Sequence, residues 1–550
     1  MKRRALLKGL ATVIPAFAIS SKLSASTWLL DPDGAAEFAR PPFSPTWESL
    51  KSYQVPDWYK DAKFGIWAHW GPQCQPERGD WYARGMYEEG SDQYKYHVEK
   101  YGHPSKFGFK DVINEWKAEK WDPEYLVGLY KNAGAQYFVA LANHHDNLDL
   151  YNSKHQAWNS VNMGPKKDIV GGWAKAAKKH KIQFGVSVHA AHAWSWYETA
   201  QRADKSGPMA GVPYDGKLTK ADGQGKWWDG QDPQELYAQN HPLSERSENN
   251  GTIHSQWNWG GGVAKPTEEH IEKFYQRTID LIDQYDPQLV YFDDTALPFW
   301  PISDAGLRIA AHLYNKSVKK HGKLKAVING KILDKEQRQC MVWDIERGQS
   351  NEIEPYTWQT DTCIGSWHYD RRIYDNHHYK SAKTVIHTLA DVVSKNGNLL
   401  LNVPLRGDGT MDSDELKVVT EIGEWMKVNK EAIIGTRPWK KFGEGPAIEN
   451  AAPLSAQGFN EGKGKPFGAQ DIRFTTKGKL LYAIPMGWPE DGELVIKSLG
   501  SDNPALARVN SITMLGHGAI KDFTRDAEGL KIKLPVGKPA LSYAYVLKIS

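Results

Sequence analysis

Residues 137–151 read YFVALANHHDNLDLY, an apolar run that stops at five consecutive polar side chains, Asn143 to Asn147. A short apolar run bounded by polar residues is typical of a strand that is buried on both faces of a parallel sheet. The stretch therefore predicts a buried strand that ends in a polar cluster, and this cluster contains two imidazoles, His144 and His145.

The same pattern recurs elsewhere in the chain. Five other β-rich apolar runs end in polar side chains: FGIWAHWG (64–71), IQFGVSVHAAH (182–192), LVYFDDT (289–295), KAVINGK (325–331) and CMVWDIERG (340–348). Helical patterns lie between these runs. The clearest covers residues 266–285, where Thr267 can cap the first turn and Asp286-Pro287 ends the periodicity.

Buried strands that alternate with helices predict an α/β fold with a parallel sheet covered by helices. Six or more such units over about 350 residues favour a (β/α)8-like TIM barrel. The carboxyl ends of the strands then meet at one mouth, so the separate polar clusters come together there. A doubly wound open sheet is the alternative, but it gives no reason for so many separate polar strand ends.

The sequence also predicts domain boundaries. The barrel is expected over residues 40–435 and a C-terminal antiparallel β-sandwich over residues 440–550, because short alternating strands such as DIRFTTKGKLLYAIPM follow there. The stretch GTRPWKKFGEGP (435–446) reads as a linker between them. Within the barrel, residues 199–262 form a long insertion rich in Gly, Asp and Trp. We expect most of its tryptophans to pack the loop, and these include Trp227, Trp228, Trp257 and Trp259.

Residues 1–25 have a basic start, an apolar middle and a small-residue end, which indicates a bacterial export signal. Arg3-Arg4 followed by Leu6 and Leu7 is similar to the twin-arginine type. The apolar part, residues 9–19, is too short to span a membrane. The expected location of the mature protein is therefore the periplasm or the exterior of the cell.

Composition and charge limit the classes of function. The 550 residues are 40% hydrophobic and 25% charged, as in an ordinary globular protein. Residues 1–25 carry five basic and no acidic side chains, so cleavage after them changes the formal net charge from +3 to −2. A near-neutral protein lacks the electrostatic footprint of a nucleic-acid binder. The three cysteines form no zinc-finger spacing, although one disulfide can form in an oxidising compartment.

The polar strand ends suggest a chemistry. No HExxH motif is present, and adjacent residues such as His144 and His145 point to opposite faces of a strand, so neither a metal nor a cofactor is expected. No GxSxG motif signals a serine nucleophile. Carboxylates, imidazoles and tryptophans at one mouth suit glycoside hydrolysis. Asp293 is well placed as the nucleophile because an apolar strand fixes it, whereas Asp294 points elsewhere.

Several motifs together resemble the α-L-fucosidases of glycoside hydrolase family 29. In order, they are FGIWAHWGPQ, GDWYARGMY, ALANHHDNLDLY, LVYFDD, SKNGNLLLNV and IGEWMKVNKEAIIGTRPW, within residues 45–440. The resemblance implies a retaining exo-acting α-L-fucosidase with a (β/α)8-like barrel, a C-terminal β-sandwich and no metal. It implies a terminal α-L-fucosyl glycan, or a related L-sugar glycan, as the substrate. A homo-oligomer is common for enzymes of this size.

The resemblance assigns roles by position. Asp293 matches the nucleophile, and the expected sugar-binding residues are His69, Trp81, His144, His145, His189 and Trp367. Many family members carry a glutamate, the general acid, where this chain has Gln359, which cannot deliver a proton. We therefore expect Glu346 to be the general acid, with Asp361 as the alternative.

Two other departures concern the substrate. The family often has a tyrosine in the third-strand block, where this chain has Ser187-Val188-His189, and usually an arginine near the position of Lys331. A re-cut pocket admits L-galactose, which differs from L-fucose by a 6-hydroxyl group. The alternatives are therefore an α-L-galactosidase, or a hydrolase of sulfated L-sugars, that acts on algal polysaccharide. A second alternative, motivated by Gln359, is an inactive carbohydrate-binding relative.

Overall fold

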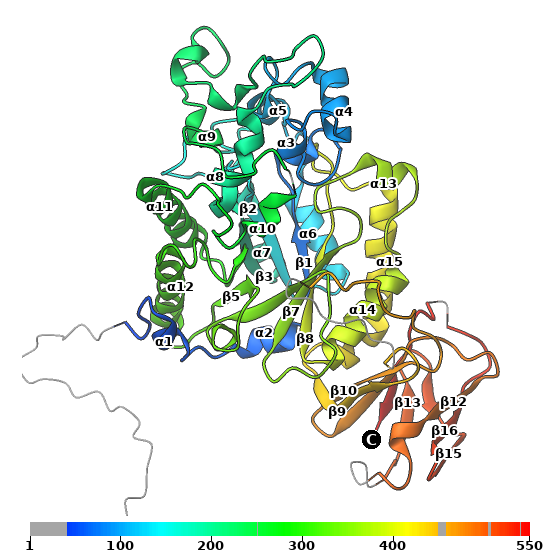
Figure 1. The fold of residues 1–550 in the computed structure, drawn as a ribbon. Coiled ribbons are helices and arrows are strands. Elements are labelled where there is room, and N and C mark those ends of the chain that lie inside the picture. The colour runs from blue at the N-terminus through cyan, green and yellow to red at the C-terminus, as the bar shows by residue number, and fades with distance from the viewer. Residues whose placement is uncertain (1–40, 250, 449–457, 504–507, 540) are drawn as a thin grey trace, which may run out of the picture. The chain divides into compact units, whose positions relative to one another are not determined.

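Eight parallel strands form a closed barrel in which the strands follow their order in the sequence (Figure 1). They are β1 (Phe64–Ala68), β2 (Tyr137–Asn143), β3 (Gln183–Val188), β4 (Leu289–Thr295), β5 (Val327–Lys331), β6 (Val342–Glu346), β7 (Trp358–Cys363) and β8 (Gly397–Asn402). β1 pairs with both β2 and β8, which closes the sheet. The predicted TIM-type barrel is thus confirmed, and the open-sheet alternative is wrong.

The computed structural model describes residues 41–249, 251–448, 458–503, 508–539 and 541–550. The chain divides into Met1–Pro42 and one compact unit, Phe43–Ser550. The predicted export signal lies outside the described residues. All three cysteines lie within them, and Cys74, Cys340 and Cys363 are buried and form no disulfide.

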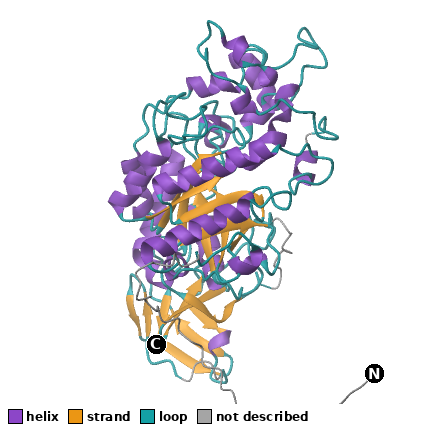
Figure 2. Ribbon diagram, turned by 90° about the vertical axis from the view of Figure 1, so that its left-hand side faces the viewer, coloured by secondary structure: helices purple, strands orange, loops and turns teal. Residues whose placement is uncertain are grey.

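Helices surround the barrel strands (Figure 2). Those that alternate with the barrel strands or follow the last of them are α6 (Pro123–Asn132), α7 (Ile169–His180), α11 (Glu268–Tyr285), α12 (Ala305–His321), α14 (Ala382–Ser394) and α15 (Ser413–Asn429). The others are α1 (Trp47–Leu50), α2 (Asp57–Ala62), α3 (Tyr82–Gly85), α4 (Asp92–Tyr101), α5 (Phe109–Glu115), α8 (Ala193–Trp196), α9 (Gln234–Tyr237), α10 (Thr252–Ser255) and α13 (Arg371–Asp375). Among the described residues, no helix is long and apolar enough to cross a bilayer.

Helix α11 follows its sequence signals closely. The Thr267 hydroxyl accepts a hydrogen bond from the His270 backbone N–H, which satisfies one of the free donors of the first turn. The helix ends where Asp286 adopts a left-handed conformation just before Pro287. Phe274, Leu281 and Ile282 are buried on its inner face, so the predicted amphipathic helix is confirmed.

The C-terminal region consists of two antiparallel sheets. One has the order β14-β13-β17-β11-β10-β9 and the other the order β12-β16-β15. The strands are β9 (Arg437–Glu444), β10 (Ile472–Lys477), β11 (Leu480–Pro485), β12 (Glu493–Ile496), β13 (Ile512–Met514), β14 (Gly518–Ile520), β15 (Phe523–Asp526), β16 (Gly529–Lys533) and β17 (Leu547–Ile549).

The predicted linker at residues 435–446 is wrong, because most of it forms strand β9. β9 is an edge strand that pairs only with β10 in its sheet, and its ladder shifts register between Arg473 and Thr475 of β10. Pro438 and two lysines are tolerated because an edge strand leaves one row of backbone groups unpaired and keeps its side chains in water. A linker-like composition and an edge strand therefore look alike in sequence.

Candidate active site

A cavity of about 290 Å³ lies at the carboxyl ends of the barrel strands. The predicted site residues that line it are His69, Trp81, His144, His189, Asp293, Glu346 and Trp367. His145 is not among the lining residues, but its Nε2 lies 3.2 Å from a carboxylate oxygen of Asp293. All eight residues predicted from the sequence therefore meet at this cavity or contact a residue that lines it.

Asp293 sits near the end of β4 and is held by three cationic or imidazole groups. Nζ of Lys331 lies 2.5 Å from its Oδ1, and Nδ1 of His189 lies 3.1 Å from its Oδ2. His145 donates its Nδ1–H to the backbone carbonyl of His189 at 2.7 Å, and its Nε2 lies 3.2 Å from the same Oδ2, a contact that holds the carboxylate when the imidazole is protonated. One face of the carboxylate is thus fixed by the protein, while Asp293 still lines the cavity.

Glu346, at the end of β6, shares the same lysine. Lys331 Nζ is 2.6 Å from Glu346 Oε2 and 2.5 Å from Asp293 Oδ1, so these two oxygens are at most 5.1 Å apart, the sum of those distances. In retaining glycosidases the two carboxyl groups lie roughly 5 to 5.5 Å apart, whereas inverting enzymes need space for a water molecule between them. This upper limit excludes the wider inverting arrangement and is compatible with the retaining one.

The two carboxyl groups differ in their affinity for a proton. Burial raises the pKa of Glu346 to about 7, and the nearby charges of Asp361 and Asp293 act in the same direction. Burial also opposes ionisation of Asp293, but the Lys331 ammonium and the hydrogen bonds from His145 and His189 outweigh it and hold the pKa of Asp293 well below its usual value. Near neutral pH, Asp293 is a carboxylate, and Glu346 can carry a proton.

The histidines of the opening stretch lie in a turn, not on the strand. β2 ends at Asn143, and the chain turns so that the Asn147 N–H donates to the carbonyl of His144 at 2.9 Å. The two imidazole centroids are only 4.4 Å apart. The turn removes the alternation that would have placed the rings on opposite faces of a strand. His144 thus lines the cavity, while His145 holds Asp293.

Hydrogen bonding fixes the form of the His144 ring. The Gln73 amide is oriented because its Oε1 accepts from the Ala83 N–H at 3.3 Å and its Nε2 donates to Asp146 at 3.0 Å. The same Nε2 lies 2.8 Å from His144 Nδ1, which must therefore accept. Burial holds the pKa of His144 well below 6.5, so the neutral ring carries its hydrogen on Nε2.

A metal is the other ligand that such a cluster could hold. Ligand atoms of His69, Asp80, His144 and His368 lie within 4.8 Å of one another. However, His144 Nε2 carries a hydrogen and cannot act as a ligand in this tautomer, and Asp80 already accepts from His368 Nδ1 at 2.7 Å. Neither ring nitrogen of the buried His69 has a hydrogen-bond partner. The unpartnered nitrogens of His69 can form hydrogen bonds with hydroxyl groups of a ligand.

The long insertion contributes to one wall. The ring of Trp81 stacks on His254 at 5.1 Å and lies parallel to Trp257 at 6.4 Å, and all three residues line the cavity. Trp228 and Trp259 are buried in the loop packing, as expected. Trp257 lines the cavity instead, and Trp227 is 41% exposed and donates its indole N–H to Asp111, so only two of the four tryptophans follow the expectation.

Asp294 also lines the cavity, but its carboxylate is held by a histidine. Its Oδ1 lies 2.8 Å from His192 Nε2, and both side chains are buried. The His192 ring is sandwiched between Trp257 at 3.9 Å and Trp259 at 4.6 Å. Asp294 thus connects strand β4 to the insertion, in keeping with a structural role.

Gln359 lies too deep in the barrel to act on a substrate. It is fully buried, and its Oε1 accepts from the hydroxyls of Tyr59 at 2.8 Å and Tyr137 at 2.9 Å. Its Nε2 donates to Asp344 at 2.7 Å. Gln359 therefore belongs to the polar interior of the barrel, and its identity says nothing about a loss of catalysis.

Asp361 lies between this interior layer and the cavity. It is paired in register with Glu346 across strands β6 and β7, and its Oδ2 accepts from the Tyr291 hydroxyl at 2.7 Å. Its side chain is almost fully buried, whereas the Glu346 side chain is 18% exposed. Glu346 is therefore the better placed of the two to reach a leaving group.

Sequence reasoning missed several residues that line the cavity. Asp80, His254 and Ile332 gave no signal that separates them from ordinary loop residues. Phe459 lines the cavity although it lies in the region expected to form a separate C-terminal domain. Lys331, seen in the sequence only as a replacement for an arginine, proves to be the group that joins the two carboxylates.

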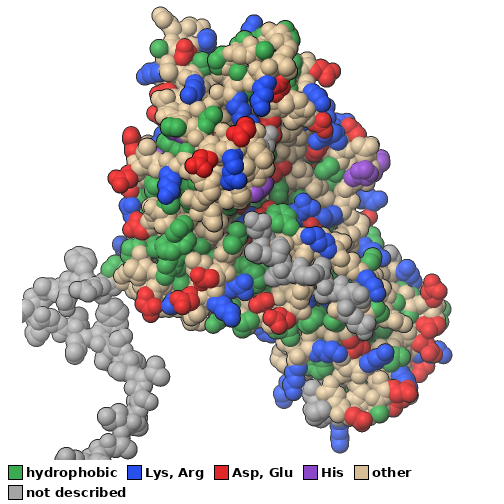
Figure 3. All heavy atoms as spheres, viewed as in Figure 1, with side chains coloured by type: hydrophobic (Ala, Val, Ile, Leu, Met, Phe, Trp, Pro, Cys, Tyr) green, Lys and Arg blue, Asp and Glu red, His purple; other side chains and the backbone are tan. Residues whose placement is uncertain are grey.

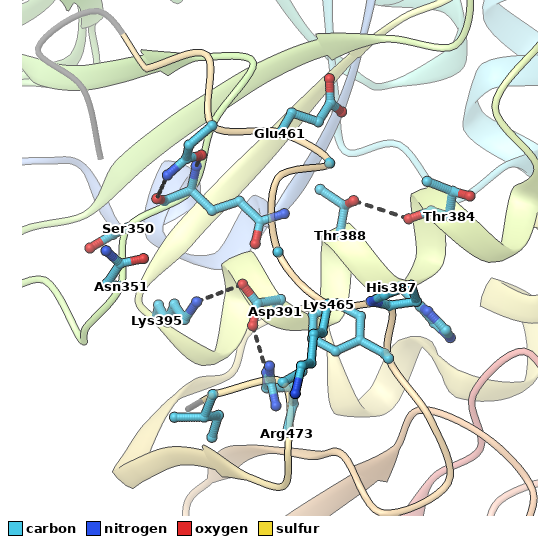
Figure 4. Close-up of a pocket in the computed structure, with 18 of the residues that line it drawn as sticks. Ser350, Asn351, Thr384, His387, Thr388, Asp391, Lys395, Glu461, Lys465 and Arg473 are labelled. Carbon is cyan, nitrogen blue, oxygen red and sulfur yellow. Dashed lines mark hydrogen bonds and ion pairs between the residues drawn. The ribbon is translucent and has the colours of Figure 1, made fainter. Parts of the chain in front are cut away.

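A larger cavity, of about 490 Å³, lies where α14 meets the C-terminal region (Figure 4). Lys395 and Arg473 lie on either side of Asp391, at 2.7 Å and 2.5 Å from its oxygens. These buried charges neutralise one another, and His387 and Thr388 come from the same helix. The arrangement suits a structural junction between the barrel and the C-terminal sheets.

Comparisons with known proteins agree with this geometry. A family model described as Alpha-L-fucosidase matches residues 33–431, and one described as Alpha-L-fucosidase C-terminal domain matches residues 465–550. Tissue alpha-L-fucosidase of Homo sapiens is 26% identical over 540 residues, which cover 94% of this chain and 95% of the relative. The Rattus norvegicus enzyme is 25% identical and covers 92% of both chains. The crystal structure of Thermotoga maritima alpha-fucosidase superposes with a TM-score of 0.66 at 25% identity, over 92% of this chain and 100% of that one.

Proposed function

Because the chain belongs to the α-L-fucosidase family of glycoside hydrolases, we propose that Asp293 and Glu346 hydrolyse terminal α-L-fucosides with retention of configuration. The observation that supports this most directly is the pair of carboxyl groups on one ammonium, at a spacing compatible with retention and with opposite pKa shifts. A carboxylate and a carboxylic acid at that spacing are the two groups that a double displacement needs.

In the first step, a carboxylate oxygen of Asp293 attacks the anomeric carbon while Glu346 gives its proton to the departing glycosidic oxygen. The bond from the anomeric carbon to that oxygen breaks, and Asp293 becomes an ester. In the second step, the Glu346 carboxylate takes a proton from water, whose oxygen displaces Asp293. The negative charge moves from Asp293 to Glu346 and back, and Lys331 contacts both groups.

The imidazoles are suited to hold the sugar. The Nε2–H of His144 offers a donor, and both nitrogens of His69 and Nε2 of His189 are buried without protein partners. The fixed hydrogen-bonding groups of these rings can match the hydroxyl pattern of one sugar ring. Trp81 supplies an apolar face beside them. A cavity of about 290 Å³ suits one terminal residue, which agrees with exo-acting hydrolysis.

The charges around the cavity argue against a sulfated sugar at the cleavage position. Its lining includes five carboxyl groups and only one lysine: Asp80, Asp293, Asp294, Glu346 and Asp361 against Lys331. An anionic substituent would be repelled by the ionised members of this set. A neutral deoxy-sugar avoids that repulsion, and this favours L-fucose over sulfated L-sugars.

The test is the hydrolysis of 4-nitrophenyl α-L-fucoside and 4-nitrophenyl α-L-galactoside by the mature protein. We expect efficient release from the fucoside, and nuclear magnetic resonance should show the α-anomer of fucose as the first product. Faster release from the galactoside would show that the site around His189 accepts a 6-hydroxyl group. Binding without turnover of either compound would support a carbohydrate-binding relative instead.

We also propose that residues 1–25 direct export and that the mature enzyme acts on oligo- or polysaccharides outside the cytoplasm. The support is the twin-arginine-like sequence with Arg3-Arg4. Expression in a bacterial host with and without a Tat translocase, followed by cell fractionation, tests it. Replacement of Arg3-Arg4 by Lys-Lys should retain the protein in the cytoplasm.

A further inference from the structure

The segment Gly458–Glu461, here called the strap, contacts the end of β6 at the proposed general acid. Gly458 forms an isolated parallel bridge with Glu346, and the N–H of Phe459 donates to the carbonyl of Glu346 at 2.7 Å. The N–H of Glu461 donates to the carbonyl of Arg347 at 2.9 Å. The strap thus extends the barrel sheet locally with residues that follow β6 by more than a hundred positions in the sequence.

Side chains anchor the far end of the strap. Glu461 lies 2.6 Å from Lys380 and 3.3 Å from Arg347, and it accepts from the Thr362 hydroxyl at 2.8 Å. Its carboxylate therefore ties the strap to three places on the barrel wall. Because the backbone of Glu346 is bonded to this anchored segment, the strap limits the movement of the acid.

The contact at Gly458 requires glycine. Its φ is +91°, and a Cβ atom there would lie 2.1 Å from the carbonyl oxygen of Glu346. Neither the conformation nor the distance is compatible with another side chain unless the backbone shifts. The backbone of the acid and that of the strap are therefore packed directly against each other.

Phe459 combines an uncommon backbone conformation with an exposed aromatic side chain. Its φ is +54°, a region that residues with a Cβ rarely occupy, and its side chain is 43% exposed although it is a large apolar group. The ring lines the catalytic cavity together with Trp367 and Ile332. Strained residues that present an exposed aromatic ring to a site often serve ligand binding.

We propose that the strap is part of the active site, in which Phe459 packs against the ring of the departing group and the Gly458 contact fixes Glu346 for proton transfer. The ligand class is a saccharide ring that presents an apolar C–H face, or an aromatic ring in its place. The inference rests on the proposed hydrolysis by Asp293 and Glu346. It adds a leaving-group subsite built by residues from beyond the barrel.

The first experiment compares two substrates that differ in the departing group. Phenyl α-L-fucoside has a ring to pack on Phe459, whereas α-L-fucosyl fluoride has none. For Phe459→Ala, kcat/KM for the phenyl compound should fall about 5- to 10-fold while the fluoride changes less than about twofold. Phe459→Tyr should restore the ratio. Equal losses on both substrates would overturn the leaving-group subsite.

The second experiment tests whether Gly458 positions Glu346. It compares two aryl fucosides whose leaving groups differ in how much protonation they need. Gly458→Ala should lower kcat/KM for phenyl α-L-fucoside about 100-fold but for 2,4-dinitrophenyl α-L-fucoside less than about fivefold, because kcat/KM reports the first step and the second leaving group needs little protonation there. Gly462→Ala is the matched control, since Gly462 also has a positive φ, of +72°, but a Cβ there meets nothing within 4 Å. Circular dichroism and thermal unfolding establish that each variant is folded.

The outcomes separate this inference from the proposed function. If the wild-type protein hydrolyses none of the three fucosides, the proposed function fails. If it hydrolyses them and Gly458→Ala behaves like Gly462→Ala, only the positioning by the strap fails. If Gly458→Ala slows both aryl fucosides equally while remaining folded, the strap shapes the site as a whole and does not act through proton transfer.

Discussion

The mouth of the barrel and the layer beneath it are both polar, yet they differ in how fully their groups are bonded. At the mouth, His69 has two buried nitrogens and His189 has one without a partner. The layer beneath contains the cross-strand pair Asp344 and Gln359, which precedes the pair Glu346 and Asp361 on strands β6 and β7. There the Gln359 amide makes three hydrogen bonds, to Tyr59, Tyr137 and Asp344. Unused hydrogen-bonding capacity costs stability and persists where a ligand uses it. Polarity alone therefore does not mark the site. Unpartnered atoms mark it only where they face the cavity, because Asn329 and Asn398 of the deeper layer also keep a buried amide oxygen without a partner.

The mouth and the layer beneath it also differ in the charge of their side chains. On the outer surface, basic and acidic side chains are interspersed over the face shown in Figure 3. Inside the mouth, Asp293 and Glu346 are placed around Lys331, and one of them holds a proton more tightly than the other. In the layer below, burial and the neighbouring Asp361 hold the pKa of Asp344 well above its usual value. Charged groups therefore lie at the mouth, whereas the environment of Asp344 in the deeper layer disfavours its charged form.

The largest effect expected at the mouth is that of Asp293→Ala. Loss of the nucleophile should lower kcat for 4-nitrophenyl α-L-fucoside by roughly four orders of magnitude. Azide should restore turnover and give β-L-fucosyl azide, since the anion attacks from the side that Asp293 vacates. Asp294→Asn is the control at the adjacent position, with an effect below about tenfold. An active Asp293→Ala enzyme would refute the assignment of the nucleophile.

The next effect is that of Glu346→Gln, which keeps the shape of the side chain but removes its proton. We expect kcat for phenyl α-L-fucoside to fall about 10²- to 10⁴-fold. The loss for 2,4-dinitrophenyl α-L-fucoside should be much smaller in the first step, and the intermediate should accumulate because no general base then activates water. Steady-state rates and a burst of dinitrophenolate measure the two parts. A uniform loss of kcat/KM, which reports the first step, on both substrates would leave Asp361 as the candidate acid.

The deeper layer should respond in stability and not in chemistry. Gln359→Ala leaves the hydroxyls of Tyr59 and Tyr137 without their acceptor and creates a cavity, so we expect it to destabilise the fold by about 2 to 4 kcal/mol. The kcat of the folded protein should stay within about threefold of the wild type. Thermal unfolding and fucoside hydrolysis at low temperature measure these separately.

Gln359→Glu tests whether a carboxyl group in the deeper layer can take part in catalysis. Introduced into Glu346→Gln, it should restore no activity, because residue 359 does not line the cavity. Recovery of hydrolysis of phenyl α-L-fucoside would show that residue 359 reaches the substrate in solution, which would contradict the distinction between the two layers.

The sequence predicts more of the barrel than of the site. Buried parallel strands are continuous apolar runs, so LVYFDDT and YFVALAN reveal both the strands and their polar ends. The depth of a polar residue along a strand is harder to read. Glu346 and Gln359 each lie on a strand that carries other polar residues, and only the closed barrel shows that one reaches the mouth and the other does not.

Two other features had no readable signal. Phe459 reaches the cavity through a backbone bridge with Glu346, and backbone pairing between distant segments leaves no pattern in a single sequence. The strand β9 was mistaken for a linker because edge strands tolerate proline and lysine. In both cases the missing information is tertiary contact, whereas local propensity and periodicity served well for helix α11.

The smallest predicted effect is a shift in pH dependence that depends on Asp361. The pKa of Glu346 is raised to about 7, so the acid is protonated below that pH, and kcat/KM for phenyl α-L-fucoside should decline as the pH rises through about 7. Asp293 keeps its charge far below that pH because its pKa is lowered.

The negative charge of Asp361 raises the proton affinity of Glu346, so Asp361→Asn should move the alkaline limb to lower pH by about one pH unit. Asp344→Asn is the matched control, because the pKa of Asp344 is held well above its usual value and its replacement should remove less negative charge. The groups that face Glu346 are Lys331, Asp293 and Asp361, and the first two are unchanged in both variants. An alkaline limb that stays in place in Asp361→Asn would mean that burial alone sets the proton affinity of the acid, and that the two layers are electrostatically separate.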